Sequence, residues 1–225
     1  MKVLVIFSGG LDSSVCLAKA IKEYGKKNVI ALSFDYGQKN SKELLKAKEL
    51  CKYYNVEQIC MNIKELFKYS SSSMLKSSNV ELPKISYQEQ LKNNIKEVST
   101  NIAFRNGILL SIATSIAISK KIDKIYYGIH NEGIATTLYP DCCENFNLAM
   151  NLAIYIGSGN KVKVEAPLVN MLKAEVIKLR IELDVPFEKT WTCYENKKKP
   201  CQRCTACRDR IEGFKKNNLI DPLLK

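Results

Sequence analysis

Short apolar runs alternate with longer segments of helical periodicity along most of the chain. The apolar runs predict strands at 2–7, 28–34, 56–63, 124–129 and 162–166. Apolar residues three or four positions apart predict helices at 13–24, 41–54, 103–120, 143–156, 172–183 and 205–216. Strands that alternate with helices pair in parallel through right-handed crossovers. The pattern therefore predicts an α/β fold with a doubly wound, five-stranded parallel sheet, whose ligand binds beyond the carboxyl ends of the strands.

Residues 66–99 interrupt this order with a serine run, Pro83 and many polar positions. They predict an insertion with mobile loops, for which a lid is one role, and not a separate domain. We expect one α/β domain over residues 1–190 and a C-terminal segment, residues 191–225, packed on it.

A glycine- and serine-rich segment, SGGLDSS at residues 8–14, joins the first predicted strand to the first predicted helix. Glycines let the backbone bend and approach a phosphate closely, and the N–H groups at a helix start bind anions. Asp12 is a candidate for holding Mg²⁺ or orienting the loop. The segment lacks the lysine of a Walker A loop and the third glycine of a dinucleotide-binding turn. It predicts a nucleotide-phosphate site, with a simple chain-reversing turn as the alternative.

Four of the nine cysteines gather near the C-terminus, at Cys193, Cys201, Cys204 and Cys207. This spacing lets the thiolates converge on one Zn²⁺ ion at about 2.3 Å, and four protein ligands make such a site structural. An iron–sulfur cluster, a redox pair and a zinc ribbon that reads nucleic acid are the alternatives. The odd number of cysteines argues against a disulfide framework.

The net charge of +12 comes from 35 Lys+Arg against 23 Asp+Glu. A basic chain suits anionic ligands, but the lysines are spread along the sequence, so we do not predict a nucleic-acid surface. No apolar run is long enough to cross a bilayer, and the opening apolar stretch is too short for a signal peptide. We therefore expect a cytoplasmic protein without membrane contact.

Motifs along nearly the whole chain resemble the 7-cyano-7-deazaguanine synthase (QueC) family of PP-loop ATP pyrophosphatases. They include FSGGLDSSVCL, FDYGQK, AFRNGILLS, YPDC, LKAE, VPFEKTWTCY and PCQRCTACRDRIEGF. The resemblance implies an adenine nucleotide α-hydrolase-like fold, a structural Zn²⁺, ATP with Mg²⁺, and a homodimer. It implies a ligase that turns 7-carboxy-7-deazaguanine and ammonia into the nitrile through adenylated intermediates, in queuosine-type deazapurine biosynthesis.

The resemblance also implies the residues that bind ATP: Phe7, Ser8, Gly9, Gly10, Leu11, Asp12, Ser13, Ser14, Val15, Cys16, Leu17, Asp35, Tyr36 and Gly37. The expected catalytic residues are Asp12, Ser13, Arg105 and Lys173. A charge at the start of an apolar helix is costly without a partner, so we expect Arg105 to meet phosphate or the substrate carboxylate. Arg105, Asn106 and Asp141 are the expected substrate contacts. His130, the only histidine, is expected to be a structural residue.

Some positions differ from the family pattern, including Asn40 and, after YPDC, Cys143 and Asn145. They leave open a relative that adenylates a deazaguanine carboxylate and passes it to another amine, for example on a protein in anti-phage defence. A PP-loop enzyme that modifies tRNA is a further alternative, with Cys142 and Cys143 as its only candidate cysteine pair.

Overall fold

The computed structural model describes residues 1–93, 95, 97–130, 138–195 and 197–224. In this part of the chain, a five-stranded parallel sheet has the order β3-β2-β1-β4-β5. Its strands are β1 (Val3–Ile6), β2 (Val29–Asp35), β3 (Glu57–Asn62), β4 (Lys124–Tyr126) and β5 (Lys163–Glu165). The predicted doubly wound sheet is confirmed.

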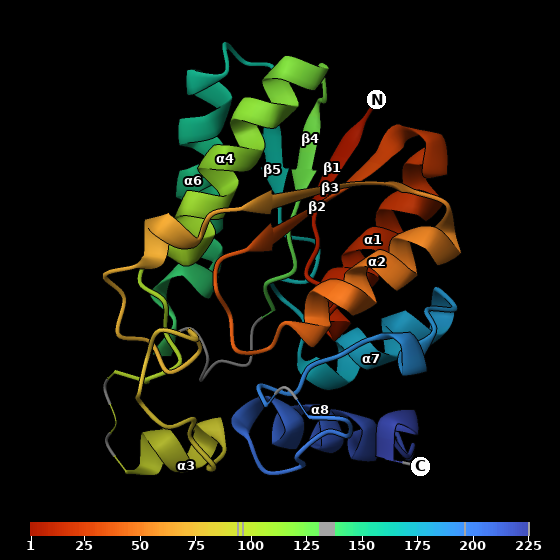
Figure 1. The fold of residues 1–225 in the computed structure, drawn as a ribbon. Helices are drawn as coiled ribbons and strands as arrows, with labels where there is room; N and C mark the ends of the chain where they lie inside the picture. Colours follow the sequence, from red (N-terminus) through yellow and green to blue (C-terminus); the bar gives the residue numbers. More distant parts are fainter. Residues whose placement is uncertain (94, 96, 131–137, 196, 225) are drawn as a thin grey trace.

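Helices cover both faces of the sheet (Figure 1). One face carries α1 (Leu11–Tyr24), α2 (Lys42–Tyr54) and α7 (Lys173–Glu182), and the other carries α4 (Arg105–Lys120) and α6 (Glu144–Gly157). Among the described residues, two further helices, α3 (Tyr87–Lys92) and α8 (Thr205–Lys216), lie beyond the end of the sheet where the strands stop. Single 3₁₀ turns are η1 (Lys26–Asn28), η2 (Lys64–Phe67), η3 (Pro140–Cys142), η4 (Phe187–Lys189) and η5 (Pro222–Leu224).

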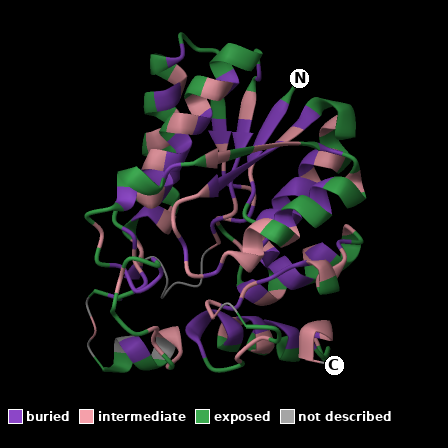
Figure 2. Cartoon of the chain, viewed as in Figure 1, coloured by how far each residue is buried: buried purple, intermediate pink, exposed green. Residues whose placement is uncertain are grey.

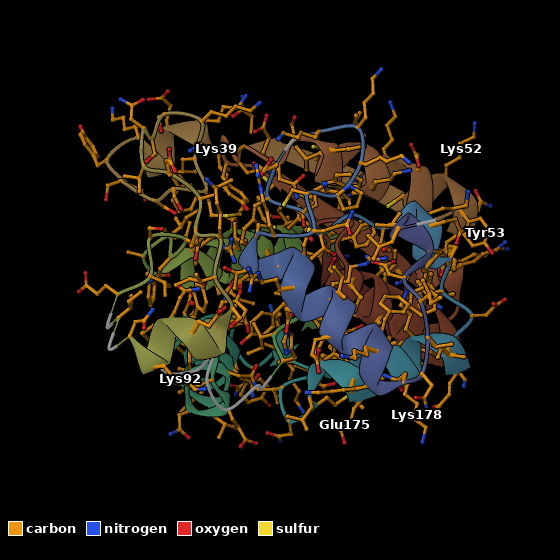
Figure 3. The ribbon with its side chains drawn as sticks, turned by 90° about the horizontal axis from the view of Figure 1, so that it is seen from below. Lys39, Lys52, Tyr53, Lys92, Glu175 and Lys178 are labelled. Atoms are coloured by element: carbon orange, nitrogen blue, oxygen red, sulfur yellow. The ribbon has the colours of Figure 1, made fainter. Side chains whose placement is uncertain are left out.

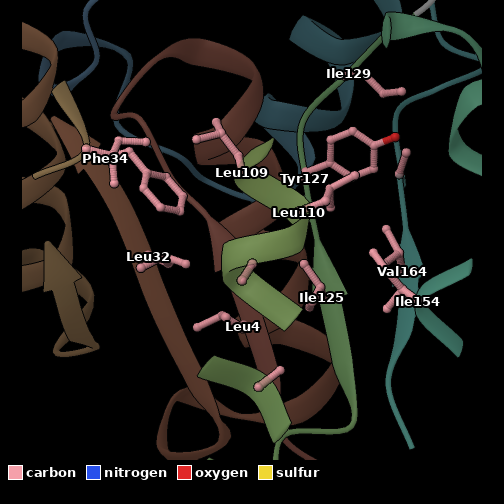
Figure 4. Close-up of a cluster of buried hydrophobic side chains, with 14 of the residues drawn as sticks. Leu4, Leu32, Phe34, Leu109, Leu110, Ile125, Tyr127, Ile129, Ile154 and Val164 are labelled. Atoms are coloured by element: carbon pink, nitrogen blue, oxygen red, sulfur yellow. The ribbon is translucent and has the colours of Figure 1, made fainter. Parts of the chain in front are cut away.

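The alternation of side chains along β1 divides the core into two layers. Val3 and Val5 pack with α1, α2 and α7, whereas Leu4 packs with α4 and α6. Successive residues of a strand point to opposite faces, and a parallel sheet is buried on both. Figure 4 shows the second layer, where Leu4, Leu32 and Ile125 meet Leu110. The central strands β1 and β2 are therefore largely buried, whereas the edge strand β3 has no buried residue and further exposed residues lie on the outer helix surfaces (Figure 2).

The strand order reverses beside β1, because β2 lies on one side of it and β4 on the other. Loops that leave neighbouring strands in opposite directions open a crevice at such a switch point, where ligands bind in this class of fold. The loop after β1 is the glycine- and serine-rich segment at residues 8–14. The fold thus brings the predicted phosphate loop to the position where a ligand is expected.

Helix α3 was not predicted, because residues 66–99 show no helical periodicity. It has six residues, too few to be stable alone. Contacts with the C-terminal segment support it: Thr205 Oγ1 donates to the Ile85 carbonyl at 2.8 Å, and Gln90 Nε2 donates to Thr205 Oγ1 at 3.3 Å. The insertion therefore packs on the cysteine-bearing segment. The mobility of 66–99 and the division into 1–190 and 191–225 stay predictions.

In the part of the chain that the structure describes, no helix combines the length and apolar character needed to span a membrane.

Candidate active site and metal centre

A cavity of about 290 Å³ lies at the switch point. Its walls come from the ends of β1 and β4, from the starts of α1, α4 and α7, and from α2. Tyr87 of α3 and Thr192, Tyr194 and Asp209 of the C-terminal segment complete it. Segments that lie far apart in the sequence therefore close over the end of the sheet, as Figure 3 shows with α8 crossing the middle of this end.

The phosphate loop is held by its own hydroxyl groups. The Ser8 amide donates to Ser13 Oγ at 3.2 Å, the Gly10 amide donates to Ser8 Oγ at 3.1 Å, and Ser14 Oγ donates to the Gly10 carbonyl at 2.7 Å. Gly10 is the N-cap of α1, and no side chain among the described residues caps that helix start. The first N–H groups of a helix have no partner within the helix, so they are available to an anion.

Gly9 packs against α2 more closely than a side chain would allow. It has φ +84°, and a Cβ there would lie 2.4 Å from the Glu43 carbonyl oxygen and 2.5 Å from the Ala47 nitrogen. The Trp191 amide donates to the Gly9 carbonyl at 3.1 Å, and Lys42 Nζ lies 3.8 Å from the centre of the Trp191 ring. The loop is thus fixed between α2 and the C-terminal segment.

A buried charge cluster adjoins the loop. Lys173, 5% exposed, donates to both carboxylate oxygens of Asp12 at 2.9 Å. Its Nζ lies 3.0 Å from His130 Nε2 and 3.4 Å from Asp209 Oδ2. Burial acts to raise the pKa of Asp12, but Lys173 and His130 hold that pKa below its usual value. The expected catalytic residues Asp12 and Lys173 therefore meet, although 161 positions separate them.

His130 differs from the expectation of a structural residue with satisfied hydrogen bonds. It lines the cavity, and its Nδ1 is buried without a hydrogen-bond partner among the described residues. Burial and the adjacent Lys173 ammonium lower the pKa of His130, which favours the neutral ring. A lone histidine gives no local signal that it will join a lysine and two carboxylates, so the sequence could not place it here.

Arg105 and Glu43 also line the cavity, and Glu43 lies beside the phosphate loop, where its Oε1 is 3.0 Å from the position of a Cβ on Gly10. Arg105 Nη1 donates to the Tyr36 hydroxyl at 3.3 Å. Burial acts to lower the pKa of Arg105, but Tyr36 and Cys142, together with nearby carboxylates, raise it, so the guanidinium stays charged. Burial raises the pKa of Glu43 to about 8, although Arg105 opposes that shift. Sequence reasoning did not assign Glu43 a role, because a glutamate in the first turn of a predicted helix is common and marks no site.

Asn106 and Asp141 are joined behind the cavity wall. The Asn106 amide donates to Asp141 Oδ2 at 2.9 Å, and Asn106 Nδ2 donates to the Asp141 carbonyl at 3.0 Å. Cys142 Sγ donates to Asp141 Oδ1 at 3.6 Å. Asp141 thus satisfies an N–H at the start of α4, while Asn106 and Cys142 line the cavity. The substrate role of Asn106 and Asp141 stays a prediction.

Three tyrosines that the sequence analysis did not single out line the far end of the cavity. Tyr87 comes from α3, Tyr139 precedes η3, and Tyr194 follows the first cysteine of the cluster. The Tyr87 and Tyr194 hydroxyls lie 3.3 Å apart. Burial raises the pKa of all three phenols, so they are neutral and able to donate hydrogen bonds. They offer aromatic faces and hydroxyls to a planar ligand.

The residues predicted to bind ATP do not all line the cavity. The cavity is lined by Ser8, Gly10, Leu11, Asp12, Ser13 and Tyr36. The side chains of Phe7, Val15, Cys16 and Leu17 instead lie in the hydrophobic layer between the sheet and α1. Asp35 accepts from the Gly37 amide at 3.1 Å and pairs with Lys64 at 2.8 Å, which holds the turn after β2. Contact between these residues and ATP stays a prediction.

The four cysteines converge as their spacing predicted. The Sγ atoms of Cys193, Cys201, Cys204 and Cys207 all lie within 4.8 Å of one another. The Cys201 amide donates to Cys193 Sγ, and the Cys204 amide donates to Cys201 Sγ, each at 3.3 Å. Such N–H donors favour thiolates, and four thiolates in this arrangement fit a metal ion such as zinc.

A phosphate loop of this form at a parallel switch point defines the class of PP-loop enzymes that handle ATP. Residues 2–218 match the family described as queuosine biosynthesis protein QueC. A protein named 7-cyano-7-deazaguanine synthase 2 from Colwellia psychrerythraea is 38% identical over 222 residues, 99% of this chain and 97% of that protein. A 7-cyano-7-deazaguanine synthase from Archaeoglobus fulgidus is 36% identical over 225 residues, 100% of this chain and 90% of that protein.

The chain therefore belongs to the QueC family, and the resemblance stated from its motifs is confirmed. Its relatives are named as synthases, so the protein is an enzyme. The alternatives with a different amine acceptor or with tRNA are not favoured by these relatives.

Proposed function

We propose that the protein converts 7-carboxy-7-deazaguanine and ammonia into 7-cyano-7-deazaguanine at the expense of ATP. The observation that carries this proposal is the arrangement of the phosphate loop, Lys173 and Arg105 around one cavity, in a chain that matches the QueC family over residues 2–218. The relatives' names supply the product class.

The chemistry requires an activated carboxylate, because a carboxylate is a poor electrophile without a good leaving group. Its attack on the α-phosphate of ATP forms an acyl adenylate and releases pyrophosphate. Ammonia then displaces AMP and gives the amide. A second ATP adenylates the amide oxygen, and loss of AMP and the remaining nitrogen proton leaves the nitrile.

Different residues of the cavity carry out different parts of this work. The N–H groups at the start of α1 and the Lys173 ammonium hold the departing pyrophosphate. Arg105, held by Tyr36, meets the substrate carboxylate and aligns it with the α-phosphate. The hydroxyls of Tyr87 and Tyr194 face the heterocycle. Catalysis then rests on positioning and on neutralising phosphate charge.

Two metal ions complete the proposal. The four cysteines would hold Zn²⁺, and a closed shell of four thiolates gives that ion a structural role. The Asp12 carboxylate is the group that fits Mg²⁺ beside the triphosphate, where the ion would supply positive charge to the leaving pyrophosphate.

Mass spectrometry of the products from 7-carboxy-7-deazaguanine, ATP and ammonia tests the function. We expect the nitrile together with AMP and pyrophosphate, and no nitrile when ammonia is left out. Asp12→Asn should abolish AMP formation, because it removes the carboxylate that holds Lys173. Asp184→Asn is the matched control, since Asp184 is exposed and has φ +50°, a conformation that asparagine tolerates. AMP release without nitrile would refute ammonia as the acceptor.

We further propose the homodimer that the family resemblance implies, with α6 as the contact. Leu148, Leu152 and Ile156 are 57%, 60% and 65% exposed, and their spacing of four aligns them on one face of the helix. A second copy can cover this stripe with the same stripe about a twofold axis. Light scattering should give a dimer for the unaltered protein and a monomer for Leu152→Asp. A cytoplasmic location stays a prediction of the sequence.

A further inference from the structure

The buried lysine of the cavity is held from two directions. Asp12 of α1 contacts the Lys173 ammonium at 2.9 Å on one side, and Asp209 of α8 contacts it at 3.4 Å on another. Figure 3 shows Lys52, Lys92 and Lys178 at the periphery, whereas Lys173 is 5% exposed. The adenylation chemistry assigns a task to Asp12 and Lys173 and none to Asp209.

Helix α8 touches the start of α7 with residues spaced four apart. Asp209 meets the Lys173 ammonium, and Asn217 Nδ2 donates to the Ala174 carbonyl at 3.0 Å. Between them, a Cβ on Gly213 would lie 2.9 Å from Lys173 Cγ and 2.7 Å from Ile177 Cδ1. Residues four apart share a helix face, so this face receives both the stem and the charged end of Lys173.

The position of α8 is itself fixed. Cys204 is its N-cap and Cys207 lies in its first turn, so the cysteine cluster anchors the helix start. Arg210 is buried and donates to the two Asp221 oxygens at 2.6 and 2.8 Å, which ties the helix to the C-terminal tail. Asp209 therefore stands on a rigid support within one turn of the metal ligands.

We propose that Asp209 is a positioning residue for adenylation: α8 uses it to set the Lys173 ammonium in the phosphate pocket. This inference rests on the proposed function. Asp209 does not reach the phosphates as a donor, because a carboxylate only accepts hydrogen bonds. Asp209 affects the reaction by positioning Lys173. The cysteine cluster affects the reaction in the same way, because it anchors the helix that carries Asp209.

The test compares Asp209→Asn with Glu212→Gln. Each change removes one negative charge from α8, but Glu212 is exposed. We expect Asp209→Asn to lower kcat about tenfold to a hundredfold, because a misplaced group near the reacting atoms costs rate. The KM for ATP should stay equal or fall, since a carboxylate near the triphosphate is lost. Asp209→Glu should recover part of kcat, and Glu212→Gln should change neither constant.

Two outcomes would overturn the proposal. One is an unchanged kcat in Asp209→Asn. The other is a rise in KM together with a loss of bound zinc, which marks a merely structural role. In a Lys173→Met background, Asp209→Asn should cause no further loss of pyrophosphate release; an equal loss in both backgrounds would show that Asp209 acts independently of Lys173.

A readout without catalysis separates this inference from the proposed function. Lysine acylation followed by peptide mass spectrometry reports how tightly each ammonium is held. Asp209→Asn should raise the labelling rate of Lys173 several-fold relative to the exposed Lys178 on the same helix. If the unaltered enzyme forms no nitrile but this rise occurs, the proposed function fails and the positioning of Lys173 stands. An unchanged rate at Lys173 refutes the positioning.

Discussion

Replacing Gly9 with alanine should damage both the stability and the activity of the protein. The alanine Cβ would lie 2.4 Å from the Glu43 carbonyl oxygen and 2.5 Å from the Ala47 nitrogen, both backbone atoms that cannot rotate away. Overpacking of this kind costs about 1–3 kcal/mol. The φ of +84° adds about 1–2 kcal/mol for a residue with a Cβ. The expected loss in the free energy of unfolding is thus about 2–5 kcal/mol.

Substitutions at two other glycines separate the cost of overpacking from the cost of the positive φ. Gly159 has φ +66°, and no atom of the described residues lies within 4 Å of its ideal Cβ, so Gly159→Ala should cost only the backbone part, about 1–2 kcal/mol. Gly157 has no positive φ, and its ideal Cβ has no neighbour within 4 Å in the part of the chain that the structure describes, so Gly157→Ala should be neutral or stabilising by about 0.5–1 kcal/mol. Urea unfolding of the zinc-loaded proteins measures all three, provided that their m values agree.

Activity gives the second measurement. Relief of the clash moves either α2, which carries Glu43, or the loop that is proposed to bind phosphate. A displacement near 1 Å costs about a hundredfold in rate, so kcat of Gly9→Ala should fall by about that factor. The reasoning is refuted if Gly9→Ala loses no more stability than Gly159→Ala and keeps its kcat.

Three further predictions concern the metal site, Glu43 and Arg180. Chelation, or Cys201→Ser, should lower the thermal midpoint and the activity together, because the cysteine cluster anchors α8, and added Zn²⁺ should restore the chelated protein alone. The affinity for ATP should fall as the pH rises through about 8, where Glu43 ionises beside the phosphate loop; calorimetric titration of Glu43→Gln should lack that step. Arg180→Met should raise the unfolding free energy by about 1–3 kcal/mol in urea, because the buried Arg180 nitrogens have no hydrogen-bond partner among the described residues. Burial lowers the pKa of Arg180 to about 8, so above that pH the folded protein loses this proton while the unfolded chain keeps it. The unaltered protein therefore becomes more stable as the pH rises above about 8, and the stability gained by Arg180→Met should be full only below about pH 8. An equal gain in stability at about pH 10 would contradict this account.

Local features of the sequence predicted the architecture well. Apolar runs separated by helical periodicity led to the five parallel strands, and these runs are nearly continuous in β1 and β2, because a strand buried on both faces needs nearly continuous apolar residues. The phosphate loop and the cysteine cluster could equally be recognised in the sequence, since the residues that form each site lie close together along the chain. The spacing of residues along the sequence encodes such sites, so they can be predicted without the tertiary structure.

The buried charge cluster depended on tertiary structure alone. Asp12, His130, Lys173 and Asp209 belong to four separate segments, and nothing in their own neighbourhoods marks them as partners. The sequence indicated Asp12 and Lys173 as catalytic residues, led to the expectation that His130 is a structural residue, and did not single out Asp209. The packing of α7 and α8 across the ends of the strands brings them together, and that packing depends on shape complementarity between whole helices, such as the space left by Gly213.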